Sequence, residues 1–89
     1  MEIKLTPQAL KHLEEWKKSG NAKVQNKITL LIEEILNEPF GGIGKPEPLK
    51  HDLSGKWSRR ITQEHRIVYD VQNHCLNIYS LKGHYRKKE

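Results

Sequence analysis

Apolar residues recur at helical spacing in two stretches of the first half of the chain. The first begins at Thr6-Pro7, where the threonine can cap a helix and the proline ring already has a helical φ. The second lies between Asn21, which can cap it, and Pro39, which ends it, and has a wide apolar face that suits packing against a sheet. The two predicted helices carry Ala9, Leu10, Leu13 and Trp16, and Val24, Ile28, Leu31, Ile32, Ile35 and Leu36.

Shorter runs predict strands, one before the two helices and three after them. Residues 3–5 predict the first strand, and β-branched or aromatic residues are frequent in 56–62, 65–71 and 75–82. The short connections between the last three predict antiparallel pairing. We therefore expect an α+β domain of order β-α-α-β-β-β, with two helices packed on one face of a small, mainly antiparallel sheet and the other face open.

Alternation along these strands predicts which side chains reach the open face. The apolar positions of 65–71 would face the helices, which turns Arg66 toward the open face. Arg60 would share that face, whereas Arg59 would lie on the side of Trp57. A β-bulge would exchange Arg59 and Arg60, so the sequence leaves open which of them faces outward.

The last predicted strand, 75–82, has two competing apolar faces. Leu76 and Ile78 alternate in one phase, and Tyr79 and Leu81 alternate in the other. Because a regular strand turns successive side chains to opposite faces, the two pairs cannot both reach the core. The pattern does not decide between them.

Composition limits the kind of protein that this chain can be. Its 89 residues suffice for one small core, and the single cysteine, Cys75, excludes an internal disulfide and argues against a cysteine zinc site. No apolar run approaches the roughly 20 residues that span a bilayer, and the N-terminus lacks a signal-peptide pattern, so we expect a cytoplasmic protein. The net charge of +5 falls entirely in residues 45–89, which favours a polyanionic partner.

The second half also supplies groups for acid–base chemistry. Two arginines on an open sheet face would form an anion site, near Glu47 and Lys50 in a loop rich in proline and glycine. His84 and Tyr85 follow the last predicted strand. RNA carries its own nucleophile, the 2′-hydroxyl, so a carboxylate could accept its proton while a histidine protonates the leaving 5′-oxygen. This set indicates phosphodiester chemistry without a metal or other cofactor.

The remaining histidines and the tryptophans have plainer interpretations. His12 is expected at the surface of the first helix, and His65 and His74 in turns. Trp16 and Trp57 are expected in the core or at an interface. No two histidines stand four positions apart beside an acidic residue, so no metal site is expected.

Long segments of the second half resemble the YoeB/Txe family of bacterial toxins in the RelE superfamily. The resemblance covers essentially the whole chain and is strongest over 39–85. It is carried by PFGGIGKPEPLKH at 39–51, DLSGKWSRRIT at 52–62, EHRIVY at 64–69 and GHY at 83–85. Agreement over so many positions is far more specific than a short motif.

This resemblance implies a RelE-like toxin domain at 1–85 and an mRNA endoribonuclease acting at the A site of the translating bacterial 70S ribosome. It also implies a YefM-like antitoxin that neutralises the toxin, and often a toxin homodimer. Family members often stop near the His-Tyr pair, whereas this chain adds a short basic tail at 86–89. The extra residues put in doubt any role for a terminal carboxylate beside Tyr85.

The resemblance also implies residue roles. Glu47 in KPEPLK would be the general base, Arg66 in EHRIVY would stabilise the phosphate, and His84 would be the general acid. Tyr85 would stack on or orient the RNA. The supporting RNA contacts would come from Lys50, His51, Arg60 and Arg59.

Overall fold

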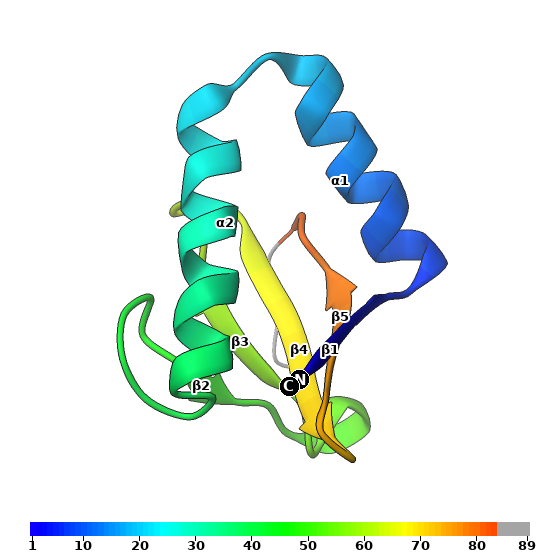
Figure 1. Cartoon of the computed structure of the whole chain (residues 1–89), viewed down its shortest axis with the longest axis vertical. Helices are drawn as coiled ribbons and strands as arrows, with labels where there is room; N and C mark the ends of the chain where they lie inside the picture. Colours follow the sequence, from blue (N-terminus) through cyan, green and yellow to red (C-terminus); the bar gives the residue numbers. More distant parts are fainter. Residues whose placement is uncertain (84–89) are drawn as a thin grey trace.

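The computed structural model describes residues 1–83, which form two helices on a mixed five-stranded sheet (Figure 1). This confirms the predicted α+β class and the order of its main elements. One strand was not predicted, a two-residue β2 that begins at Glu47. The elements are β1 (Glu2–Leu5), α1 (Pro7–Ser19), α2 (Ala22–Asn37), β2 (Glu47–Pro48), η1 (His51–Leu53, a 3-10 helix), β3 (Trp57–Arg60), β4 (Arg66–Gln72) and β5 (Cys75–Ser80).

The strands lie in the order β1-β5-β4-β3-β2. β1 is parallel to β5, and the other three neighbouring pairs are antiparallel. The parallel pair arises because the chain leaves β1 for the two helices before it builds the rest of the sheet. β4 is the central strand of the sheet (Figure 1), and it contributes Ile67 and Tyr69 to the core.

Both helices begin at the caps that the sequence predicts. The Thr6 side-chain oxygen accepts a hydrogen bond from the Ala9 amide at 3.1 Å, and Asn21 accepts one from Val24 at 3.1 Å. Each bond satisfies one of the amides that a helix start leaves without a partner. Between the helices, Gly20 adopts a left-handed φ of 71°, which lets the chain reverse direction.

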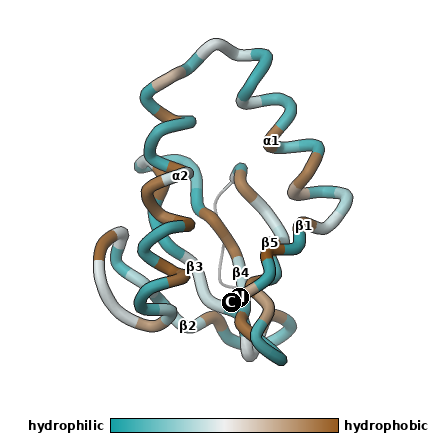
Figure 2. Tube along the Cα trace, in the orientation of Figure 1, coloured by the Kyte–Doolittle hydropathy of each residue, from teal (hydrophilic) through white to brown (hydrophobic). Residues whose placement is uncertain are grey.

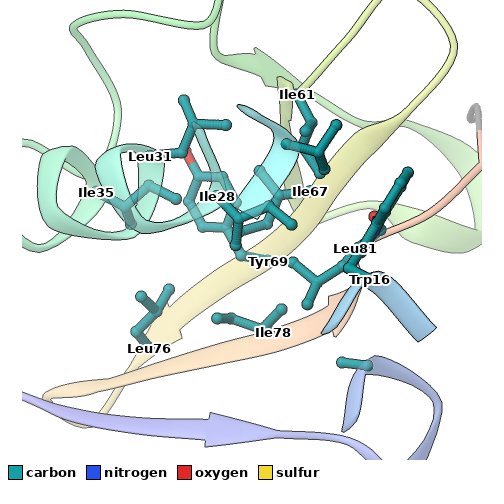
Figure 3. Close-up of a cluster of buried hydrophobic side chains, with 12 residues drawn as sticks. Trp16, Ile28, Leu31, Ile35, Ile61, Ile67, Tyr69, Leu76, Ile78 and Leu81 are labelled. Atoms are coloured by element: carbon teal, nitrogen blue, oxygen red, sulfur yellow. The ribbon is translucent and has the colours of Figure 1, made fainter. Parts of the chain in front are cut away.

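The core lies between the helices and the sheet. Apolar and polar positions alternate along α2 in Figure 2, and Figure 3 shows its buried side chains pointing toward those of β4. Within residues 1–83, no helix combines the length and the apolar character that crossing a bilayer requires. The largest fully buried apolar side chains are Tyr69, Leu31, Ile35, Ile67, Leu76, Ile78 and Leu81.

A β-bulge resolves the two competing faces of the last strand. Tyr69 of β4 pairs with Ile78, but the preceding residue, Val68, pairs with Ser80, so Tyr79 is an extra residue in β5. The bulge changes the phase of the strand. Leu76, Ile78 and Leu81 therefore all reach the core with no exposed surface, while Tyr79 does not.

The sheet face opposite the helices is less open than predicted. Asp70 lies on this face but is only 4% exposed. Its carboxylate accepts hydrogen bonds from the Tyr79 hydroxyl at 2.7 Å and from the Asn77 amide at 2.9 Å. A carboxylate can remain buried here because neighbouring side chains replace its water. The exposed part of the face is consequently concentrated toward Glu47, Arg60 and Gly83.

Candidate functional site

Three of the predicted site residues lie on one face of adjoining strands. Glu47 of β2 pairs with Ser58 of β3, and Arg60 of β3 pairs with Arg66 of β4. Paired residues in antiparallel strands point to the same face, and so do alternate residues along one strand. Glu47, Arg60 and Arg66 therefore share the face away from the helices, as expected for Arg60 and Arg66 from sequence.

The charges of this face act on one another. Burial lowers the pKa of the Arg66 guanidinium, Arg60 lowers it further, and Glu47 opposes both effects. Two facing guanidinium groups repel each other, so an anion placed between them would be stabilised by both. One carboxylate beside two cations leaves the site with an excess of positive charge, which suits a phosphate.

Arg66 is held in place by the turn that precedes its strand. Its Nη1 donates to the backbone carbonyl oxygens of Thr62 at 2.8 Å, His65 at 3.1 Å and Gln63 at 3.2 Å. These bonds restrict a side chain that is otherwise long and flexible. The guanidinium is therefore oriented before any ligand arrives, which lowers the entropy cost of binding.

The position of Arg59 corrects the sequence analysis, which expected this residue among the supporting RNA contacts. It points to the helix side, as its alternation with Arg60 suggests, but it is 0% exposed. Its Nη1 donates to the Ile43 carbonyl at 3.1 Å, and its Nη2 donates to the Glu38 carbonyl at 2.5 Å. The loop after α2 closes over this side of β3, so the Arg59 side chain does not reach the surface, and Arg60 is the exposed member of the pair.

The same loop leads into β2, where Glu47 lies (Figure 1), and hydrogen bonds attach the loop to β3 and β4. Tyr69 donates from its hydroxyl to the Pro39 carbonyl at 2.7 Å, and the Arg60 amide donates to the Gly44 carbonyl at 2.7 Å. Gly44 has a φ of 84°, and a β-carbon there would lie 2.8 Å from a methyl carbon of Leu31. Glycine is therefore required at this point for both conformation and space.

Two other predicted contacts, Lys50 and His51, are exposed where the chain passes from β2 into η1. Between them and Glu47, Leu49 is buried and donates from its amide to the Lys56 carbonyl at 2.9 Å. This anchors the segment on the sheet. Lys50 and His51 are thus on the surface, two and three residues beyond β2.

His84 and Tyr85 lie outside the described residues. The last described residue, Gly83, accepts a hydrogen bond at its carbonyl oxygen from the Arg66 amide at 2.9 Å. Its own amide donates to Nδ1 of His65 at 3.0 Å. The described chain therefore ends beside Arg66.

Two pockets border this region of the surface. One, of about 370 Å³, includes Arg60, Lys45 and Lys27 in its lining. The other, of about 350 Å³, includes Lys56 and Lys82. Among the described residues that line them, neither pocket contains an aspartate or a glutamate. Both flanks of the site are consequently suited to a polyanion.

Trp16 lies in the core and His65 in the β3–β4 turn, as expected, but the sequence did not predict that these two residues and His12 bind the segment after β5. His12 is half-buried rather than at the surface, and its Nδ1 accepts a hydrogen bond from the Leu81 amide at 3.1 Å. The Trp16 indole donates to the Leu81 carbonyl at 2.9 Å, and His65 binds Gly83. The available signal was the spacing of His12 and Trp16, which places them on the same face of α1 one turn apart.

Metal ligands are not grouped in the described part of the chain. Across residues 1–83, the structure brings together no three His, Cys, Asp or Glu side chains that could hold an ion. The ionisable side chains of the candidate site within these residues are Glu47, Arg60 and Arg66.

Comparison with known proteins shows the family. Residues 5–85 match the YoeB-like toxins of bacterial type II toxin-antitoxin systems. The chain belongs to this family. A toxin YoeB from Synechocystis sp. is 50% identical over 72 residues, which cover 81% of this chain and 84% of that protein.

Solved structures of YoeB toxins have the same fold. A YoeB–YefM complex from Staphylococcus aureus matches with a TM-score of 0.87 and 41% identity, covering 96% of this chain and 98% of that chain. A YoeB dimer from the same species matches with a TM-score of 0.88 and 40% identity over the same shares of the two chains. These YoeB-like neighbours agree with the RelE-type architecture expected from sequence.

Proposed function

We propose that this YoeB-like toxin is a metal-independent endoribonuclease that cleaves mRNA at the A site of the translating ribosome. The observation that carries the proposal is the strand register that places Glu47, Arg60 and Arg66 on one sheet face. Family membership supports the same conclusion. A carboxylate beside two guanidinium groups can both accept a proton and hold a phosphate.

In the proposed reaction, Glu47 accepts the proton of the ribose 2′-hydroxyl. The 2′-oxygen then forms a bond to the adjacent phosphorus, and the bond from phosphorus to the 5′-oxygen breaks. His84 supplies the proton that the leaving 5′-oxygen takes up, so the products are a 2′,3′-cyclic phosphate and a 5′-hydroxyl. Arg66, with Arg60 beside it, stabilises the extra negative charge of the phosphorane.

The supporting RNA contacts follow from the same surface. Arg60 and Lys50 would bind phosphates flanking the cleavage point, with His51 next to Lys50. Tyr85 would stack on or orient a base. The site is a shallow face of a domain with a radius of gyration of 12.3 Å. Such a surface offers few contacts to free RNA, so we propose that the ribosome supplies the ordered mRNA.

Glu47→Gln, Arg66→Met and His84→Gln should each reduce cleavage by about 10²–10⁴-fold, because each removes a proton-transfer group or a charge stabiliser. The measurement is primer extension on mRNA in a reconstituted translation system. Glu33→Gln and His74→Gln change exposed residues of the same types away from the site and serve as controls. Wild-type cleavage by all three site variants would refute these assignments.

The same assay tests the alternative that the chain is a non-catalytic RNA- or ribosome-binding module. A pure binder would stall ribosomes without creating new 5′ ends. The presence of Glu47 among the arginines favours cleavage, because a carboxylate weakens rather than strengthens the binding of a phosphate.

We further propose that a YefM-like antitoxin neutralises the toxin by covering the cationic sheet face. A related toxin is known in complex with YefM. An acidic, partly apolar segment that folds on binding would suit this face. Cleavage by the toxin–antitoxin complex as fast as by free toxin would contradict the idea. A homodimer is also proposed, and light scattering of the free toxin would test it.

A further inference from the structure

The last described segment, residues 81–83, is bound through its backbone by side chains from other elements. The Leu81 amide donates to Nδ1 of His12 at 3.1 Å, and its carbonyl accepts from Nε1 of Trp16 at 2.9 Å. The Gly83 amide donates to Nδ1 of His65 at 3.0 Å. The amides of the first and last residues of this segment therefore each donate a hydrogen bond to a histidine nitrogen.

These bonds define the protonation state of both imidazoles. A backbone amide can only donate, so each Nδ1 must offer a lone pair. A neutral imidazole has one accepting nitrogen, and a protonated imidazole has none. His12 and His65 must therefore be neutral, with the proton on Nε2, whenever they hold Leu81 and Gly83.

The two histidines belong to one cluster built around Trp16. The ring of His65 meets that of Trp16 edge-to-face, with 5.0 Å between centroids and an angle of 87°. Lys82 lies over the same indole ring at 5.0 Å and forms an ion pair with Glu15 at 3.1 Å. The cluster joins α1, the β3–β4 turn and the segment after β5.

We infer that His12 and His65 are positioning residues, whose neutral rings hold the backbone immediately before His84. The inference rests on the proposed role of His84 as general acid. Gly83 precedes His84 directly, and consecutive Cα atoms are separated by only 3.8 Å. The two imidazoles therefore set the point from which the chain continues into the proposed acid. Displacement of a catalytic group by about 1 Å can cost about 100-fold in rate.

Burial, more than the charges around it, keeps His12 in the accepting form. Burial lowers the pKa of His12, Lys82 and Lys11 lower it further, and Glu15 opposes them. Neutral His12 is therefore favoured at physiological pH, and acidification would remove its acceptor. Loss of either acceptor would release one end of residues 81–83.

The decisive variants compare asparagine with alanine at each histidine. The side-chain oxygen of asparagine can replace Nδ1 as an acceptor and does not titrate, whereas alanine offers no acceptor. His12→Ala and His65→Ala should each reduce the cleavage rate at least tenfold with little change in KM. His12→Asn and His65→Asn should recover most of that rate and weaken its decline at acidic pH. The exposed His74 is the control, changed to Asn because asparagine tolerates its left-handed φ of 58°, and this variant should keep the wild-type rate.

Amide NMR provides a readout that requires no cleavage. In the wild type, the Leu81 and Gly83 amide signals should shift as the histidines protonate. His12→Asn should abolish the shift of Leu81, and His65→Asn that of Gly83. Amides that do not respond to these changes would overturn the inference, as would alanine variants with wild-type rates. Equal losses in the alanine and asparagine variants would also overturn it, because the acceptor would then be irrelevant.

The two readouts separate this inference from the proposed function. A wild type that stalls ribosomes without making new 5′ ends would overturn the proposed function. The amide titration would still decide whether the imidazoles hold the segment. Normal wild-type cleavage combined with fully active alanine variants would leave the proposed function intact and overturn only the positioning role.

Discussion

Arg59 donates from Nε to the Tyr69 hydroxyl at 3.0 Å, and neither side chain has any exposed surface. The two residues lie on adjacent strands, β3 and β4, and face the helices. The Tyr69 hydroxyl in turn donates to the Pro39 carbonyl, and Arg59 also donates to the carbonyls of Glu38 and Ile43. A buried cation thus fastens the loop that leads to the proposed general base.

Replacing each of the adjacent arginines by methionine should have opposite consequences. Arg59→Met removes the donor to the Tyr69 hydroxyl and to the Glu38 and Ile43 carbonyls, and should lower the free energy of unfolding by about 2–4 kcal/mol. Arg60→Met should change stability by no more than about 0.5 kcal/mol but reduce mRNA cleavage roughly tenfold, because it removes an exposed side chain that is proposed to bind phosphate. Denaturant unfolding and primer extension measure the two effects. Equal losses of stability in Arg59→Met and Arg60→Met would show that Arg59 does not stabilise the loop.

Gly44 and Gly55 offer a matched pair for the loop before Glu47. Both have a left-handed φ, of 84° and 92°, but only Gly44 is crowded, since a β-carbon at Gly55 would meet nothing within 4 Å. Gly55→Ala should therefore cost about 1–2 kcal/mol from backbone strain alone. Gly44→Ala should cost at least about 1 kcal/mol more, because Leu31 and Arg59 must shift. Denaturant unfolding measures the free energy of unfolding of both variants. Equal losses in Gly44→Ala and Gly55→Ala would contradict the prediction.

Tyr79 should make the fold sensitive to alkali. Burial, together with its hydrogen bond to the Asp70 carboxylate, raises the pKa of Tyr79 from 10.0 to about 12. A phenol with a raised pKa in the folded state stabilises the fold fully below about pH 10, and this contribution is lost as the pH rises through about 12. Tyrosinate absorbance and denaturant unfolding between these pH values measure the effect.

Tyr79→Phe should reduce the alkaline loss of stability, although the variant starts less stable because Asp70 loses a donor. Some loss should persist in the variant, since burial also raises the pKa of Tyr69. An unchanged slope of stability against pH in Tyr79→Phe would mean that this hydroxyl ionises as in the unfolded chain.

Asn21 should contribute to stability through its cap alone. Its side chain accepts from the Val24 amide at 3.1 Å, so Asn21→Ala should cost about 1 kcal/mol. For a domain of this size, that corresponds to a fall in Tm of roughly 4–8 °C. Asn26→Ala, at an exposed position inside α2, is the control and should not lower Tm. Calorimetry measures the Tm of both variants. Equal Tm values would show that the Asn21 cap does not stabilise the fold.

Most of the fold and part of the site could be predicted from the sequence. The caps at Thr6 and Asn21 and the apolar face of α2 follow from interactions within a few residues, so a linear pattern contains them. The shared face of Arg60 and Arg66 follows from strand alternation. The roles of Glu47 and His84, in contrast, came from the family resemblance and stay predictions.

Other features depend on which segments meet. The bulge at Tyr79 is set by the pairing of β4 with β5, and the burial of Arg59 is set by the loop that closes over it. His12 lies 69 positions from the amide that it binds. Hydrophobic periodicity by itself determined the two helices with their inward faces and the inward face of β4, because burial of apolar side chains repeats with the local geometry. Only the tertiary structure decided which arginine is buried and which histidines accept hydrogen bonds, because their partners come from distant parts of the chain.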